Sequence, residues 1–371
     1  MMNLQQCLNE MLVHQASDLF ITVGMPVSAK INGQLTPLTS MPLDQQQALD
    51  LVHQAMSEEQ KHAFVRDKEC NFAIAREKLG RFRCSAFWQR DQAGMVVRRI
   101  VTDIPQSKDL GLPPILNDII MAKKGLVLFV GGTGTGKSTS LAALIGHRNQ
   151  HSYGHILTIE DPIEFVHEHR NCVVTQREVG IDTLSFDDAL KSSLRQAPDL
   201  ILIGEIRSME TMEYAMSFAD TGHLCVATLH ANNASQAIER IMHLAPKGMH
   251  DKLRFDLSLN IRAIVAQQLV PTVDGKGRVA AIEVLLNSPL VADLIQRNEI
   301  GALKEAMQKG KEMGMQTFDM ALYDLVKAGK IDQQQAMHHA DSANDLRLMF
   351  KLDSDSGGGL GSLQNVSIDM D

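Results

Sequence analysis

Short apolar runs alternate with helical patterns through the middle of the chain. A short apolar run bounded by turns is typical of a strand that is buried on both faces. Strands that alternate with helices form a parallel sheet with helices on both faces. We therefore expect an α/β domain with a mostly parallel sheet. The expected strands are residues 126–130, 155–159, 199–204 and 223–229.

In the first hundred residues, apolar positions recur with helical spacing in some segments and alternate with polar positions in others. This pattern predicts a small α+β domain over residues 1–100. An amphipathic helix is expected at its start, over residues 4–12. Apolar and polar positions alternate on both sides of Asn32-Gly33, which predicts a β-hairpin because both turn positions need positive φ. The other expected elements are a strand over 19–23, one or two helices over 44–65, and strands over 71–100.

Proline and glycine residues mark a linker over residues 101–115, which separates this domain from a second one over residues 116–350. After Gly275 the pattern becomes mostly helical. The last segment, residues 351–371, is rich in Asp, Ser and Gly, so we expect it to be a disordered tail.

Composition narrows the class of function. Apolar residues make up 44% of the 371 residues, which is enough for two cores. The net charge of −8 and the lack of long basic runs argue against a protein that coats nucleic acid. The five scattered cysteines fit a reducing cytosol. No apolar run approaches the roughly 18 residues of a membrane span, so we expect any membrane association to be peripheral.

A glycine-rich turn follows the first of the four runs. Residues 131–138 read GGTGTGKS and match the phosphate-binding pattern G-x-x-x-x-G-K-[ST]. Glycines let the backbone approach a ligand, and successive N–H groups can then surround the α- and β-phosphates. Lys137 is expected to reach the β- and γ-phosphates, and the Ser138 hydroxyl to ligate Mg²⁺. The residues expected to bind nucleotide are Gly131, Gly132, Thr133, Gly134, Thr135, Gly136, Lys137, Ser138 and Thr139.

Acidic residues follow two of the other strands, and ligands of open parallel sheets bind at the carboxyl ends of strands. Glu160, Asp161 and Glu164 come directly after the second run. One of them can orient a water and accept its proton during attack on a γ-phosphate, or the cluster can simply face solvent. Glu205 follows the third run and is one carbon longer than the usual Asp, so we expect it to hold a Mg²⁺-bound water.

Two histidines flank the fourth run. His230 lies at its carboxyl end, where it can sense a γ-phosphate. His223 lies at the other end, where a structural role is the alternative. No spacing among these groups resembles a zinc site, so the expected metal is the Mg²⁺ that arrives with the nucleotide, held at Ser138 and Glu205.

Arginines are concentrated in the last two strands expected in the first domain. Arg81 and Arg83 are two residues apart and therefore share one face of their strand. One hypothesis is that this face is merely solvated. The other is that these arginines, with Arg98, are offered to an anion such as a nucleotide phosphate across a domain or subunit boundary.

The order of these motifs resembles the secretion ATPase superfamily and, within it, the type IV pilus retraction ATPases. The resemblance covers nearly the whole chain up to residue 350. The segments that carry it are GGTGTGKS, ILTIEDPIEFVH, APDLILIGEIR and TGHLCVATLHAN, with SDLFITVGMP and GRFRCSAFWQR before them and GMQTFDMALYDLVKAGKI after them.

The resemblance implies a PAS-like N-terminal domain and a RecA-like ATPase domain that bind ATP and Mg²⁺ between them. It implies a homohexamer at the cytoplasmic face of the inner membrane. The implied partners are a PilT-type retraction ATPase and the inner-membrane platform protein of the pilus machine, with no nucleic acid. By matching position, the implied roles are general base for Glu164, second-box acid for Glu205, histidine box for His223 and His230, and phosphate-approaching arginines for Arg81, Arg83 and Arg98.

Two departures place the chain nearest the accessory PilU branch of that family. Residues 290–300 read LVADLIQRNEI where PilT-type motors carry AIRNLIRE, and Phe20 stands where they tend to have His. The implied function is Mg²⁺-dependent ATP hydrolysis that drives or assists pilus retraction and twitching motility. The alternatives are an ATP-binding ring partner that stacks on a PilT hexamer, and a RecA-like nucleic-acid motor, which the acidic net charge disfavours.

Overall fold

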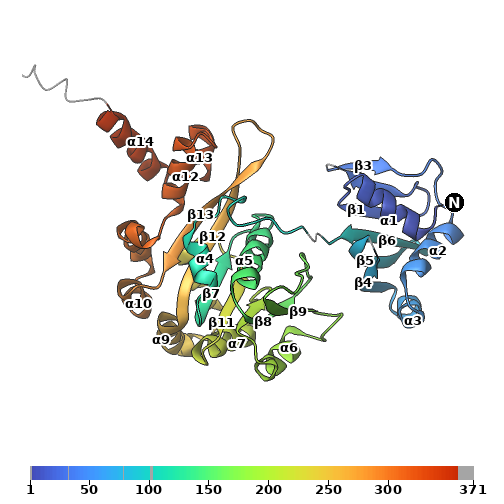
Figure 1. Cartoon of the computed structure of the whole chain (residues 1–371), viewed down its shortest axis with the longest axis horizontal. Coiled ribbons are helices and arrows are strands. Elements are labelled where there is room, and N and C mark those ends of the chain that lie inside the picture. The colour runs from blue at the N-terminus through green and yellow to red at the C-terminus, as the bar shows by residue number, and fades with distance from the viewer. Residues whose placement is uncertain (1, 32, 78, 101–102, 358–371) are drawn as a thin grey trace, which may run out of the picture. The chain divides into compact units, whose positions relative to one another are not determined.

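The computed structural model describes residues 2–357 except 32, 78, 101 and 102 (Figure 1). Contacts between residues divide the chain into two compact units, each described here by itself. The first unit contains Met1–Ile104, Asp161–Glu168 and Gln176–Ala189, and the second contains Pro105–Glu160, His169–Thr175 and Leu190–Asp371.

The first unit is built on a six-stranded sheet in the order β3-β2-β1-β6-β5-β4. Every neighbouring pair is antiparallel, as expected for short alternating strands joined by tight turns. The hairpin predicted around Gly33 is present, with Ile31 opposite Gln34. The strands are β1 (Asp18–Ile21), β2 (Ser28–Ile31), β3 (Gln34–Pro37), β4 (Glu69–Arg76), β5 (Gly80–Gln89) and β6 (Gln92–Arg99).

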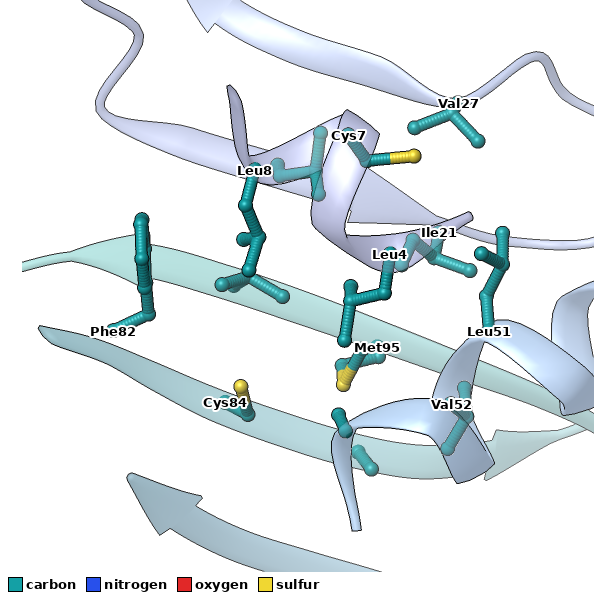
Figure 2. Close-up of a cluster of buried hydrophobic side chains, with 14 of the residues drawn as sticks. Leu4, Cys7, Leu8, Ile21, Val27, Leu51, Val52, Phe82, Cys84 and Met95 are labelled. Atoms are coloured by element: carbon teal, nitrogen blue, oxygen red, sulfur yellow. The ribbon is translucent and has the colours of Figure 1, made fainter. Parts of the chain in front are cut away.

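Three helices contribute to the core beside this sheet. Each begins with a capping box, in which the side chain of the N-cap residue accepts the N3 amide and the N3 glutamine accepts the N-cap amide. Figure 2 shows the resulting core, in which Leu4 and Leu8 of the first helix lie over the strands that carry Phe82 and Met95; Leu8, Phe82 and Met95 are fully buried. The helices are α1 (Leu4–Val13), α2 (Gln45–Ala55) and α3 (Glu58–Asp67).

The second unit contains a seven-stranded sheet in the order β13-β12-β7-β11-β10-β8-β9. The pairs from β12 to β8 are parallel, so the prediction of a mostly parallel sheet is confirmed. The four predicted strands are all present. The strands are β7 (Gly125–Val130), β8 (Gly154–Glu160), β9 (Cys172–Glu178), β10 (Leu200–Ile203), β11 (Leu224–Leu229), β12 (Ile261–Pro271) and β13 (Arg278–Leu286).

The segment after Gly275 is mostly helical, as expected, but a strand that was not predicted, β13, precedes its helices. The sequence RVAAIEVLL contains several good helix formers, but β13 pairs with β12 over nine residues, from Ala263 opposite Leu286 to Pro271 opposite Arg278. This antiparallel pairing overrides the local propensity.

Helices cover both faces of the second sheet. Val127 and Phe129 of β7 pack in one cluster with side chains of α4 and α5, while Leu126 and Leu128 point to the opposite face and are equally buried. Helix α7 packs against β7 and β11. The α-helices here are α4 (Ile115–Ile120), α5 (Lys137–His151), α6 (Phe186–Ser193), α7 (Met209–Asp220), α8 (Ala234–Leu244), α9 (His250–Asn260), α10 (Pro289–Gln296), α11 (Leu303–Lys309), α12 (Phe318–Lys327), α13 (Gln333–His339) and α14 (Ala343–Gly357).

The domain limits drawn from the sequence stay predictions, but two observations bear on them. The contact-based units divide at Ile104, inside the predicted linker, and two segments after residue 160 group with the first unit. Helix α14 continues to Gly357, so the first residues of the predicted tail are helical, and residues 358–371 lie outside the described part.

No helix of the described residues is long and apolar enough to cross a membrane.

Candidate nucleotide site

The glycine-rich loop lies at the carboxyl end of β7, in the middle of the second sheet. β7 lies between β11 and β12, and α5 begins at Lys137 directly after the loop. Gly136 is the N-cap of this helix with φ +85°. The fifteen-residue helix therefore directs its first amides, including those of Ser138 and Thr139, towards the loop, which is a favourable place for phosphate.

Two of the loop glycines are required by their surroundings. A Cβ on Gly131, which has φ +154°, would lie 2.6 Å from the backbone oxygen of Gln267. A Cβ on Gly136 would lie 2.9 Å from Nε2 of the same residue. The loop is thus pressed against β12, and its backbone forms a cradle that larger residues would fill.

Side chains within the loop complete this cradle. The Lys137 ammonium donates to the carbonyl oxygens of Gly131 and Gly132, at 2.8 Å each. The Thr135 hydroxyl donates to the Gly132 carbonyl at 2.9 Å. Because Lys137 lies beside the loop backbone, its charge is placed where the phosphates of a nucleotide would enter.

A second polar cluster lies at the ends of β10 and β11. Glu205 follows β10, and its Oε2 accepts from Arg207 at 2.7 Å. His230 follows β11, and its Nε2 lies 3.1 Å from Oε1 of the same glutamate. The Thr228 hydroxyl donates to the Gly204 carbonyl and fixes the turn that carries Glu205. Glu205 and His230 thus lie together at the carboxyl ends of two neighbouring strands, and their expected roles stay predictions.

A cavity of about 880 Å³ adjoins the loop on the side of β12 and β13. Gly136, Thr139 and Ser140 form one wall, and Leu269 and Arg278 lie among the residues that form the others. Its lining combines aliphatic side chains with a few charged and hydroxyl groups, as is common in small-molecule pockets. This wall was not predicted from the sequence, because the pattern of residues 278–286 did not indicate a strand.

His223 does not join the predicted site. It directly precedes β11, and its backbone oxygen accepts the amide of Gly125, the first residue of β7. Its Nδ1 lies near the Thr221 hydroxyl at 3.1 Å and the Phe218 carbonyl at 3.3 Å. The length of β7 separates it from the loop, about 20 Å for six residues. His223 therefore lies at the amino ends of the strands, and a catalytic role for it stays a prediction.

The acidic segment after β8 is divided between the two units. Glu160, the last residue of β8, accepts the Thr158 hydroxyl at 2.6 Å. Glu164 is exposed and lies in Asp161–Glu168, which groups with the first unit. Its predicted role as general base therefore stays a prediction.

The three predicted arginines share one face of the first sheet. Arg83 is directly opposite Arg98 on the neighbouring strand, and Arg81 lies two residues before Arg83. Arg98 is engaged, since its Nε donates to Asp18 Oδ1 at 2.7 Å. Asp18 is only 6% exposed. A role of these arginines toward phosphate stays a prediction.

The donor set fits a nucleotide that brings its own metal. The loop offers a backbone cradle, a lysine and a helix start, and Glu205 offers a carboxylate after β10, two strands from β7 in the same sheet. Among the described residues, no group of three or more His, Cys, Asp or Glu side chains could hold a metal ion by itself. A hydroxyl and a carboxylate oxygen suit Mg²⁺, so the assignment of Ser138 and Glu205 as its ligands stays a prediction.

Comparison with known proteins identifies the family of the chain. The family described as "Type II/IV secretion system protein" matches residues 1–352. The type IV pilus ATPase PilU of Pseudomonas aeruginosa is 59% identical over 355 residues, which cover 96% of this chain and 93% of PilU. PilT of the same organism, named a type IV pilus retraction ATPase, is 39% identical over 325 residues, or 88% of this chain and 94% of PilT.

Among solved structures, the crystal structure of the pilus retraction motor PilT with bound ADP has a TM-score of 0.88 and 36% identity. It covers 94% of this chain and all of that chain. The prediction of a PAS-like α+β domain followed by a RecA-like ATPase domain is thereby confirmed. The enzyme class is ATPase. The chain belongs to the type II/IV secretion system protein family and, within it, to the ATPases of type IV pili.

Proposed function

We propose that this protein hydrolyses ATP with Mg²⁺ and thereby assists the retraction of type IV pili. The observation that carries the proposal is the position of the phosphate loop beside the Glu205–His230 pair. They follow β7, β10 and β11, which are neighbours in one parallel sheet. This arrangement brings a phosphate cradle, a carboxylate and a histidine to one edge of the sheet.

Each side chain has a distinct proposed task. Lys137 neutralises charge on the β- and γ-phosphates, and the loop amides bind the phosphate oxygens. Ser138 and Glu205 would hold Mg²⁺, which supplies charge neutralisation between the phosphates. Glu164 accepts the proton of the attacking water. His230 senses the γ-phosphate through Glu205.

The biological setting is proposed from the relatives. PilU and PilT are named as ATPases of type IV pili, and the chain covers nearly the full length of both. We propose a homohexamer at the cytoplasmic face of the inner membrane that acts with a PilT-type ATPase and the platform protein in twitching motility. The accessory role follows from residues 290–300, which lack the AIRNLIRE motif.

Phosphate release by the purified hexamer tests the enzymatic part. We expect Mg²⁺-dependent turnover that Lys137→Ala abolishes and that Glu164→Gln lowers by about 100-fold or more while ATP still binds. Glu168→Gln, a change of another exposed glutamate four residues away, is the matched control and should retain turnover. An assembled ring without turnover would contradict the proposal.

A second function is favoured by the same departure at residues 290–300. The protein would then be a ring partner that binds ATP and acts mainly by stacking on a PilT hexamer. A strain carrying Glu164→Gln separates the two functions. Loss of twitching supports hydrolysis as the contribution of this chain, whereas wild-type motility supports the ring partner.

A further inference from the structure

We propose that Gln267 is a positioning residue that sets the orientation of the phosphate loop for nucleotide binding. Gln267 lies in β12, far from the loop in sequence, and is only 2% exposed. The inference rests on the proposed binding of ATP at this loop and adds a residue outside the phosphate-binding motif.

Gln267 contacts the loop and its helix through both atoms of its amide. Nε2 donates to the backbone carbonyl of Thr135 at 2.9 Å. Oε1 accepts the hydroxyl of Ser140, in the first turn of α5, at 2.8 Å. The carbonyl can only accept, so the amide nitrogen must face Thr135 and the amide oxygen must face Ser140. Among uncharged side chains, an amide supplies this donor and acceptor at two separate atoms.

The bond to Thr135 has a consequence for the next amide. In a trans peptide the carbonyl and the following N–H point in opposite directions. When Gln267 holds the Thr135 carbonyl toward β12, the N–H of Gly136 points away from β12. An amide turned in this way faces the concave side of the loop, where phosphate oxygens bind.

Close packing leaves the loop little freedom to take another orientation. The backbone oxygen of Gln267 is the atom that a Cβ on Gly131 would strike, and its Nε2 is the atom that a Cβ on Gly136 would strike. Gln267 thus restricts the backbone of the loop at both of its ends, Gly131 and Gly136. Gln267 also lines the cavity beside the loop, so it connects the cavity wall to the phosphate cradle.

Gln267→Glu gives a test with a pH readout. A buried carboxyl has a raised pKa. When it is protonated, it can donate to the Thr135 carbonyl as the amide does. When it is ionised, it can only accept, and its oxygen opposes the carbonyl oxygen. We expect the affinity of the full-length variant for ADP, measured by calorimetry, to be at least about tenfold below wild type at pH 9. It should return to within about threefold of wild type near pH 5.5.

The matched control is Gln268→Met on the same strand. Gln268 points to the other face and donates to the His339 carbonyl at 3.0 Å. Its replacement by Met therefore removes a partly buried hydrogen bond of the same kind without changing a contact of the loop. This variant should bind ADP like wild type across the same pH range. A Gln267→Glu variant that binds like wild type at pH 9, or that is weakened equally at every pH, would overturn the inference.

A second pair of variants keeps the test valid if Gln267→Glu fails to fold. Gln267→Met fills the same volume without either hydrogen bond, and Ser140→Ala removes one partner. The double variant should bind ADP no more weakly than Gln267→Met alone, because the bond between the two side chains is already lost. Fully additive losses would overturn the inference. Lys137→Ala is the reference: if it left ADP affinity unchanged, the proposed nucleotide site itself would be wrong.

Discussion

Oε1 of Glu283 accepts the backbone N–H of Ala234 at 2.8 Å, so a carboxyl group of β13 caps the first turn of α8. Glu283 is only 2% exposed. Burial raises its pKa from 4.5 to about 7, with the bond from Ala234 opposing the shift and the nearby Asp341 carboxylate adding to it. The loop that carries His230 directly precedes α8. The hydrogen bond from Ala234 to this carboxyl group therefore holds the helix end to which that loop is attached.

This pKa predicts that the protein loses stability as pH rises. The folded state holds the proton of Glu283 more tightly than the unfolded state does. The stabilisation is therefore complete below pH 4.5 and is lost as pH rises through 7. We expect the free energy of unfolding to fall by about 1–3 kcal/mol over this range. Chemical denaturation at several pH values measures it.

Glu283→Gln should remove most of this slope, because the amide does not titrate. Part of the slope remains, since burial also raises the pKa of Asp341. Glu299→Gln changes an exposed carboxylate and should keep the wild-type slope. Equal slopes for Glu283→Gln and the wild type would show that Glu283 is not the group responsible.

Lys304 joins two carboxylates of very different burial. Its ammonium lies 2.8 Å from Asp319 Oδ2 and 3.1 Å from Asp345 Oδ2. The Asp319 side chain is 2% exposed and that of Asp345 is 56% exposed. We expect Lys304→Met to cost about 3 kcal/mol because it leaves a buried charge unpaired, whereas Asp345→Asn should cost less than about 1 kcal/mol. Denaturant titration compares the two, and equal costs would contradict the prediction.

Two adjacent glycines of the phosphate loop should respond differently to substitution. Gly131→Ala places a methyl group 2.6 Å from the Gln267 carbonyl oxygen. The nearest atom to a Cβ on Gly132 is a methyl carbon of Thr135 at 3.8 Å. We expect Gly131→Ala to lower stability by about 2–4 kcal/mol and Gly132→Ala to change it by about 0.5 kcal/mol. Melting curves recorded without nucleotide test this, and similar melting temperatures for both variants would argue against the clash.

We expect two arginines of the first unit to have different roles: Arg98 stabilises the fold, and Arg83 acts in ATP hydrolysis. Arg98→Ala leaves the buried Asp18 carboxylate without its ion-pair partner, so we expect a loss of about 1–2 kcal/mol in stability, since the Arg98 side chain is itself largely exposed. Asp18→Asn added to Arg98→Ala should recover part of this loss. Arg83→Ala should cost less stability and should instead lower kcat for ATP. Calorimetric melting and phosphate release, measured on the same samples, distinguish the two effects, and a stable Arg98→Ala variant would contradict the assignment.

Local signals predicted the elements around the phosphate loop well. The step from β7 through the glycines to α5 is encoded in residues 126–144, and apolar runs predicted β8, β10 and β11. Strands β9, β12 and β13 were not predicted. The apolar run of β9, CVVTQRE, is only three residues long. The strands β12 and β13 pair across the short turn 272–277, but two glutamines interrupt the apolar run of β12 and several good helix formers lie in β13.

The site was predicted where it follows from strand direction. Glu205 and His230 meet because the carboxyl ends of parallel strands lie at one edge, and the same rule places His223 at the opposite edge. Gln267 was missed. The signal was present, since two glutamines interrupt the apolar run of β12, and a buried amide requires partners. The sequence alone does not say that those partners are Thr135 and Ser140.

The alternation of side chains along β12 links two distant parts of the protein. Gln267 faces the phosphate loop, and the next residue, Gln268, bonds to His339 at the end of α13. These two residues are about 3.3 Å apart along the strand. The loop and the end of α13 are therefore held by two successive residues of one strand. The connection between the phosphate loop and the outer helices is thus a single peptide unit long.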